Sequence, residues 1–260
     1  MTSVYNKCLY QKRFMILGWF LGITFVSFLT MSVYNSFSGG EIARSLETLP
    51  PALQKIAGDA ISFQSLRGYI AQQIFALRVP LLLTILSIAI MVALTAGEEE
   101  RGLTETQAVL PISRSSLLLQ KLAAGLTVIG LASLGALLGV QFGLWAIGQS
   151  FSLLDVLPML LNCALVAIGY GLVAFAVGAM TGRRGLALGL ASGLAFLGFL
   201  VNSMAPSVGL FEQLDRLTLF HYYSTHDGYV WSNLALLTGV CLALIVVGTL
   251  TFRARDIRAR

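Results

Sequence analysis

The residues best suited to specific chemistry lie together in one connector, TAGEEERGLTETQAVLPISRSSLLLQK, from Thr95 to Lys121. It contains four glutamates, two arginines and one lysine, whereas the stretches on either side, 79–96 and 122–148, carry no charge. The charged residues are Glu98, Glu99, Glu100, Arg101, Glu105, Arg114 and Lys121. The connector is either a solvated hairpin or a surface on which a partner protein docks. Acidic residues contribute little to membrane topology, so four of them in one connector favour docking.

Motifs of known catalytic chemistry are absent from the chain. There is no H-E-x-x-H, no G-x-S-x-G and no P-loop G-x-x-x-x-G-K-[ST]. The two histidines, His221 and His226, are five residues apart, which does not place both on one helical face, and zinc needs three or four converging ligands. The tyrosines beside them are typical of an aromatic belt at a membrane interface. We therefore expect no catalytic residue, cofactor or metal ion in this chain.

Composition indicates the fold class. Charged residues make up 11% of the chain, hydrophobic residues 57%, and the mean hydropathy is +0.82. A helix needs about 20 apolar residues to cross a bilayer, and period-2 alternation typical of a membrane barrel is absent. We predict an all-α integral membrane protein of one domain. Its six predicted spans are 14–33, 79–96, 122–148, 156–180, 186–204 and 230–252.

Lysine and arginine predict the orientation. If six spans are correct, 12 of the 17 basic residues fall on the side that holds both termini. Basic residues concentrate in cytoplasmic loops, so both termini and the connector 97–121 are expected in the cytoplasm. The net charge of +5 reflects this bias and does not indicate a nucleic-acid partner.

The opposite side is expected to carry a long connector, 34–78. Its middle reads LPPALQKIAGD, in which Pro51 suits the first turn of a helix and Gly58 suits its end. This predicts a short amphipathic helix on the outer membrane surface, either a lid packed over the bundle or a part of a substrate exit.

Inside the predicted spans there is no aspartate, glutamate, lysine, arginine or histidine. Ion-coupled carriers usually keep such groups near the middle of the membrane, which disfavours that class. Glycines recur every four residues in the third and fifth spans, a spacing that lets helices pack closely. These glycines are Gly135, Gly139, Gly143, Gly185, Gly189 and Gly193, and they are expected to pack inside the bundle or to form a contact between subunits.

The connector itself has helix signals. Gly102 permits a turn, and Thr104 with the glutamine three residues later forms a capping box. This predicts a short helix over 105–110 that Pro111 ends, after which Ser113 caps the third span.

These residues carry a resemblance to a known family. GEEERGLTETQAVLPISRSSLLLQK is similar to the cytoplasmic coupling segment of type-2 ATP-binding-cassette permeases, with Leu110 to Arg114 as its most specific part. The Phe252, Arg255 and Asp256 ending and the six-span count also agree with that family, although Leu103 lies between the usual Gly-Thr pair.

The resemblance implies a half-size permease subunit of an exporter of drugs, lipids, peptides or ions, in a prokaryotic cell membrane. It would work with a second permease chain, either a copy or a paralogue, and with two separate ATPase subunits that bind ATP and Mg. The coupling residues it implies are Glu98, Glu99, Glu100, Arg101, Gly102, Thr104, Glu105, Pro111 and Arg114. The alternatives are a membrane scaffold that relays a signal and, less well supported, an ion-coupled carrier.

Overall fold

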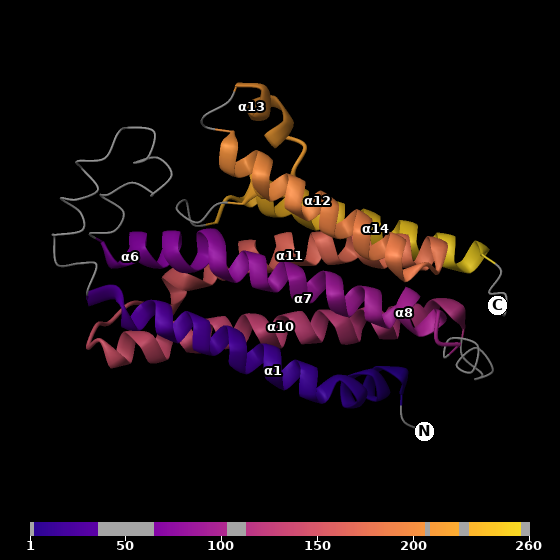
Figure 1. The fold of residues 1–260 in the computed structure, drawn as a ribbon, viewed down its shortest axis with the longest axis horizontal. Coiled ribbons are helices and arrows are strands. Elements are labelled where there is room, and N and C mark those ends of the chain that lie inside the picture. Colours follow the sequence, from indigo (N-terminus) through magenta and orange to yellow (C-terminus); the bar gives the residue numbers. More distant parts are fainter. Residues whose placement is uncertain (1–2, 36–64, 103–112, 206–208, 224–228, 256–260) are drawn as a thin grey trace.

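The structure, a computed structural model, describes residues 3–35, 65–102, 113–205, 209–223 and 229–255. These residues form an elongated bundle of helices with no strand among them (Figure 1). Six helical segments of this part of the chain are long and apolar enough to cross a membrane, as the sequence predicts. They are Val4–Ser32, Leu66–Glu99, Arg114–Ala146, Leu153–Thr181, Arg184–Met204 and Trp231–Ala254.

The second of these segments is composite, and the other five are single helices, α1, α10, α11, α12 and α14 in chain order. The composite segment joins α6 (Leu66–Tyr69), the π-helix η1 (Ile70–Arg78), α7 (Val79–Leu94) and the single turn α8 (Ala96–Glu99). Two short elements, α13 (Gly209–Asp215) and the 3-10 helix η2 (Leu219–Tyr222), lie between α12 and α14.

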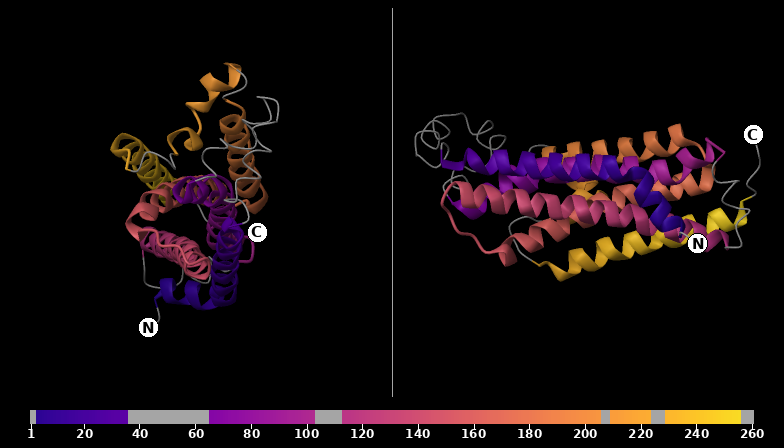
Figure 2. Two further views of the ribbon diagram at one scale, coloured as in Figure 1. Left: turned by 90° about the vertical axis from the view of Figure 1, so that its left-hand side faces the viewer. Right: turned by 90° about the horizontal axis from the view of Figure 1, so that it is seen from below.

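The bundle has a buried centre made by α7 and α11. Helices α1 and α10 pack on one side of it, and α12 and α14 lie on the other (Figures 1 and 2). Charged residues gather at the end of the bundle that contains the start of α1, α8 and the end of α14, which we call the basic end (Figure 1). The elements α6 and α13 lie at the opposite end, which we call the outer end.

The contact between α1 and α10 depends on glycines. A Cβ atom at Gly135 would lie 2.8 Å from the carbonyl oxygen of Phe20, and Cβ atoms at Gly139 and Gly143 would overlap Thr24 and Met31. The first predicted glycine stripe therefore lies inside the bundle, where small residues let the two backbones approach. The second stripe differs, because nothing lies within 4 Å of a Cβ at Gly185, Gly189 or Gly193.

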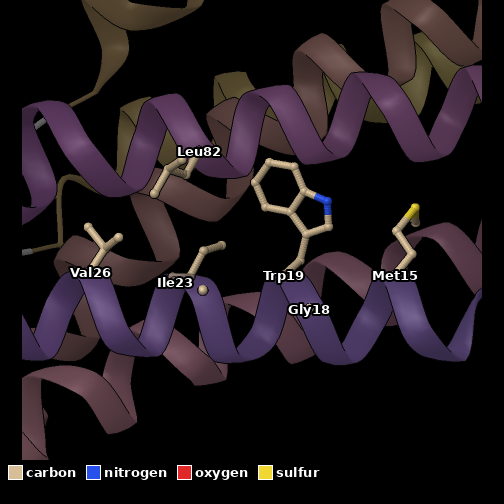
Figure 3. A pocket seen from close by; sticks show the side chains of 7 residues that line it. Met15, Gly18, Trp19, Ile23, Val26 and Leu82 are labelled. Carbon is tan, nitrogen blue, oxygen red and sulfur yellow. The ribbon is translucent and has the colours of Figure 1, made fainter.

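Elsewhere α1 leaves a gap against α7. A groove of about 420 Å³ lies between the two helices and is lined by apolar side chains, including Trp19 and Leu82 (Figure 3). No charged residue lines this groove, so its surface is as apolar as the acyl chains of a bilayer.

The start of the second span differs from the sequence prediction. Arg78 interrupts the uncharged run, so the prediction began at Val79, whereas the helix begins at Leu66. Arg78 is accommodated by its own helix, since its Nη1 donates to the side-chain oxygen of Gln73 at 2.7 Å. The first and third spans likewise begin earlier than predicted, at Val4 and Arg114, because basic residues lie within their first three turns.

The end of the π-helix η1 leaves one carbonyl without a backbone donor. In the π register an N–H donates to the carbonyl five residues earlier, as Val79 N–H does to Ile74. The next residue is Pro80, which has no N–H to donate to Phe75. The hydroxyl of Tyr223 donates to the Phe75 carbonyl instead, from the segment between η2 and α14. Burial raises the pKa of the Tyr223 phenol well above its usual range, which keeps the donor protonated.

Candidate functional site

The candidate site is α8, the single turn that carries three consecutive glutamates at the basic end. The break that separates it from α7 occurs at Thr95, whose φ of −107° and ψ of −98° are not helical. Thr95 Oγ1 donates to the Met91 carbonyl at 2.7 Å and so fills part of the interrupted ladder. Gly178 of α11 gives the break its space, because a Cβ there would lie 2.5 Å from Thr95 Oγ1.

Glu98 makes a buried ion pair with the third span. Its Oε2 lies 2.8 Å from Nζ of Lys121 in α10, and the two side chains are only 5% and 3% exposed. Removing two charges from water is costly unless each is compensated, so this pair fixes α8 against α10 only as long as both partners are present.

Glu99 makes the second contact, an ion pair with Arg255 at the end of α14. Both side chains are 21% exposed, so water reaches this pair. The pair lies against Gly182, the C-cap of α11, where a Cβ would overlap Glu99 and where φ is +63°. Glycine is required here both by the left-handed backbone and by the close approach of the ion pair.

Glu100 makes the third contact, with the fifth span. Its Oε1 accepts a hydrogen bond of 2.8 Å from the backbone N–H of Arg184, the first residue of α12. The N-cap residue Arg183 has no side-chain cap of its own, so Glu100 satisfies one of the free N–H groups at this helix start. A carboxylate is also favoured there by the helix dipole.

Three consecutive carboxylates thus bind three different helices, α10, α14 and α12. The start of α10 is tied to the end of α14 as well, since Arg114 Nη1 donates to the Arg255 carbonyl at 3.0 Å. Each of these contacts is an ion pair or a hydrogen bond, and together they hold the ends of the three helices around α8. We call Glu98, Glu99 and Glu100 with Lys121, Arg255 and the Arg184 amide the carboxylate junction.

The other predicted coupling residues divide into two groups. Arg101 and Gly102 are exposed and follow α8, with Gly102 at a φ of +70° as a turn requires. Thr104, Glu105 and Pro111, with the predicted short helix and its capping box, lie outside the described residues. Ser113 caps α10 as predicted, because its hydroxyl accepts from the Ser116 N–H at 3.2 Å.

The burial of Glu98 and Lys121 against each other was not predicted from the sequence. The prediction of spans from charge-free runs leaves both residues outside the spans. Two opposite charges at neighbouring helix ends can nevertheless be buried in the bundle as a pair. In the sequence, this pairing is indicated only by three consecutive glutamates at the end of one span and by basic residues near the ends of several others.

The histidines were interpreted as part of an interfacial belt, and the structure gives His221 a more specific role. Its Nδ1 lies 2.7 Å from Oδ2 of Asp215, a buried carboxylate that also accepts from Asn202 at 3.0 Å. No group of three metal-ligating side chains occurs within the described part of the chain. His226 and the outer helix predicted around Pro51 lie outside the described residues. Asp215 received no role from its sequence context.

A bundle of six helices long and apolar enough to cross a membrane, joined at one end by ionic contacts, defines a multi-pass membrane protein. Residues 8–253 match the family model described as "Multidrug efflux system permease Rv1217c, C-terminal domain". The match covers almost the whole chain, and the chain belongs to this family of efflux permeases. It also agrees with the resemblance to ATP-binding-cassette permeases. No curated protein matches the chain.

Proposed function

We propose that this chain is the membrane subunit of an ATP-driven exporter and that ATP is hydrolysed in a separate partner. In this proposal two permease chains, copies or paralogues, work with two ATPase subunits that bind ATP and Mg²⁺. The basic end faces the cytoplasm, in agreement with the distribution of lysine and arginine. The segment 103–112, which directly follows the carboxylate junction, rests on the ATPase.

The observation that carries the proposal is the carboxylate junction. A partner that moves the segment 103–112 moves α8 with it, because the two are consecutive in the chain. Glu98, Glu99 and Glu100 then transmit that movement to three helices that are distant in sequence. Charge-assisted hydrogen bonds are stronger and more directional than neutral ones, which suits them to this task.

A carrier driven by an ion gradient is the competing class. In the described helices the charged side chains lie toward the helix ends, and the middle of the bundle holds none. A bound coupling ion would have to rely on hydroxyl and carbonyl oxygens there. This distribution supports the ATP-driven reading.

The experiment is a comparison of energy sources. The tagged chain, co-expressed with a candidate P-loop ATPase subunit, is purified as a complex and reconstituted in sealed vesicles with Hoechst 33342 as the transported dye. We expect dye transport to require Mg-ATP and to continue when ionophores collapse the proton and sodium gradients. Transport that stops with the ionophores and ignores ATP would assign the chain to the carrier class.

Orientation is tested separately with a single cysteine. Arg101→Cys, in a chain whose three native cysteines are replaced by alanine, should react with an impermeant maleimide only after the cells are opened. Reaction in intact cells would place the carboxylate junction outside the cell and remove the basis for an ATPase contact.

A further inference from the structure

A second cavity lies between α7 and α12, on the side of the bundle away from α1. Its volume is about 270 Å³, close to the lower limit of about 300 Å³ for ligand pockets. Residues 81–89 of α7 form one wall, which corresponds to a length of about 12 Å at the rise of an α-helix. Its floor includes the buried residues Ile88, Ala195 and Phe220.

The mouth of the cavity opens on the outer surface of this chain's bundle. Phe196 is 65% exposed, and Ile85 and Leu188 beside it are also exposed. At the outer end Phe220 of η2 closes the cavity and makes an edge-to-face contact with Phe199, with 5.7 Å between ring centroids. A molecule dissolved in the bilayer can therefore enter sideways and meet aromatic rings.

Two hydroxyl groups line the cavity, those of Ser192 and Thr84, and that of Thr84 is in an unusual state. Thr84 is 5% exposed, and its Oγ1 has no hydrogen-bond partner among the described residues. Most threonines in the spans behave differently and donate to the carbonyl four residues earlier, as Thr24, Thr30, Thr95 and Thr249 do. A buried hydroxyl without a partner is unfavourable, so Thr84 is available to a ligand that supplies one.

Two other buried hydroxyls lack partners, and they show why Thr84 is different. Ser27 and Ser87 are pressed into helix contacts, against Gly139 and Gly171, where a Cβ on the glycine would overlap them. No space for a ligand exists at those contacts. Of the three, only Thr84 lines the α7–α12 cavity.

We propose that the α7–α12 cavity binds a neutral, aromatic, membrane-soluble molecule that accepts a hydrogen bond from Thr84. Charged ligands are excluded because no charged side chain lines the cavity. The aromatic rings of Phe196, Phe199 and Phe220 provide edges and faces for stacking. As a substrate site this cavity rests on the proposed export function, but binding itself requires neither the ATPase nor transport.

The test uses two probes of similar shape, benzophenone, whose ketone accepts a hydrogen bond, and diphenylmethane, which lacks the ketone. Benzophenone also forms a covalent bond to nearby C–H groups under near-ultraviolet light, so the labelled peptides can be identified by mass spectrometry. In the purified full chain in lipid nanodiscs, we expect saturable labelling of residues 81–89 and 188–199. As competitors of this labelling by benzophenone, diphenylmethane should be less effective than 4-methylbenzophenone, which keeps the ketone.

Variants separate the hydroxyl from the cavity. Thr84→Val should weaken saturable labelling about three- to tenfold, in the range of a single neutral hydrogen bond, and remove the preference for the ketone. Thr84→Ser should retain both. Ala195→Phe, which fills the cavity, should abolish saturable labelling, whereas Thr249→Val on α14 should leave it unchanged.

Two results would overturn the proposal: labelling that does not saturate, or a Thr84→Val chain that binds like the native one. The second result would show that Thr84 donates no hydrogen bond to the ligand, which leaves an apolar site for lipid acyl chains or Ser192 as the donor. Neither result bears on ATP-driven export, which is measured separately with the complex. Loss of ATP-driven transport with saturable binding intact would overturn the proposed function and leave the binding site.

Discussion

The ion pair between Glu98 and Lys121 allows the energetics of the carboxylate junction to be tested directly. Replacing Glu98 with glutamine keeps the size of the side chain but leaves the Lys121 ammonium buried without its counter-charge. Because both side chains are at most 5% exposed, water cannot take the place of the carboxylate. We expect the free energy of unfolding to fall by about 3–5 kcal/mol, the range for breaking a buried pair from one side.

The double variant Glu98→Gln with Lys121→Met gives the decisive comparison. With both charges removed, no ion remains buried, and replacing a whole buried pair by neutral groups is often neutral or stabilising. We therefore expect the double variant to recover most of the stability lost by Glu98→Gln. The cycle of two single variants and one double variant yields the coupling energy of the pair.

The assay is unfolding of the purified chain in mixed micelles with increasing sodium dodecyl sulfate, followed by the fluorescence of its three tryptophans. Glu212→Gln provides the control, because Glu212 is exposed on α13 and its replacement should change stability by no more than about 0.5 kcal/mol. If Glu98→Gln costs under 1 kcal/mol and the double variant equals the sum of the singles, the pair is not coupled and α8 is not anchored to α10.

The remaining predictions concern backbone contacts. Gly139→Ala should lower the free energy of unfolding by about 1–3 kcal/mol, because the added methyl group overpacks α1 against α10. Gly189→Ala, with nothing near its Cβ, should leave this free energy unchanged. Equal effects of the two variants in the same micelle titration would contradict the packing account. Tyr223→Phe should cost about 1–3 kcal/mol by leaving a buried π-helix carbonyl without a donor, and a loss no larger than that of an exposed tyrosine would refute this role. Gly182→Ala and Gly148→Ala both place alanine in a left-handed backbone conformation, which costs about 1–2 kcal/mol. Only Gly182→Ala also crowds the carboxylate junction, so it should lower the free energy of unfolding more than Gly148→Ala does. The reverse order would show that the junction accommodates the added methyl group.

The fold could be read from the sequence because the bilayer imposes a length and a polarity on every span. Six apolar runs predicted six helices, and the positions of basic residues predicted which connectors share a side. The span limits were less accurate, because a rule based on charge-free runs stops at any arginine. Arg78 and Arg114 lie within helices, where a neighbouring side chain or a helix-end carbonyl accepts their hydrogen bonds.

The site could be located from the sequence but not assembled. The acidic turn was recognisable as unusual, yet the partners of its carboxylates come from positions as distant as Arg184 and Arg255. Nothing in local periodicity indicates which helix ends meet, because that depends on how the six helices pack. The break at Thr95 was equally hidden, since it relies on the space that Gly178 leaves in another helix.

Three of the four acids in the connector now have a physical reason. Glu98, Glu99 and Glu100 each bind a different helix, with Glu98 buried, Glu99 partly buried and Glu100 exposed. Since consecutive residues of a helix point about 100° apart, a single turn reaches three neighbours only when it lies between them. Any movement of α8 must therefore stretch or reorient three contacts at once, whichever partner causes it.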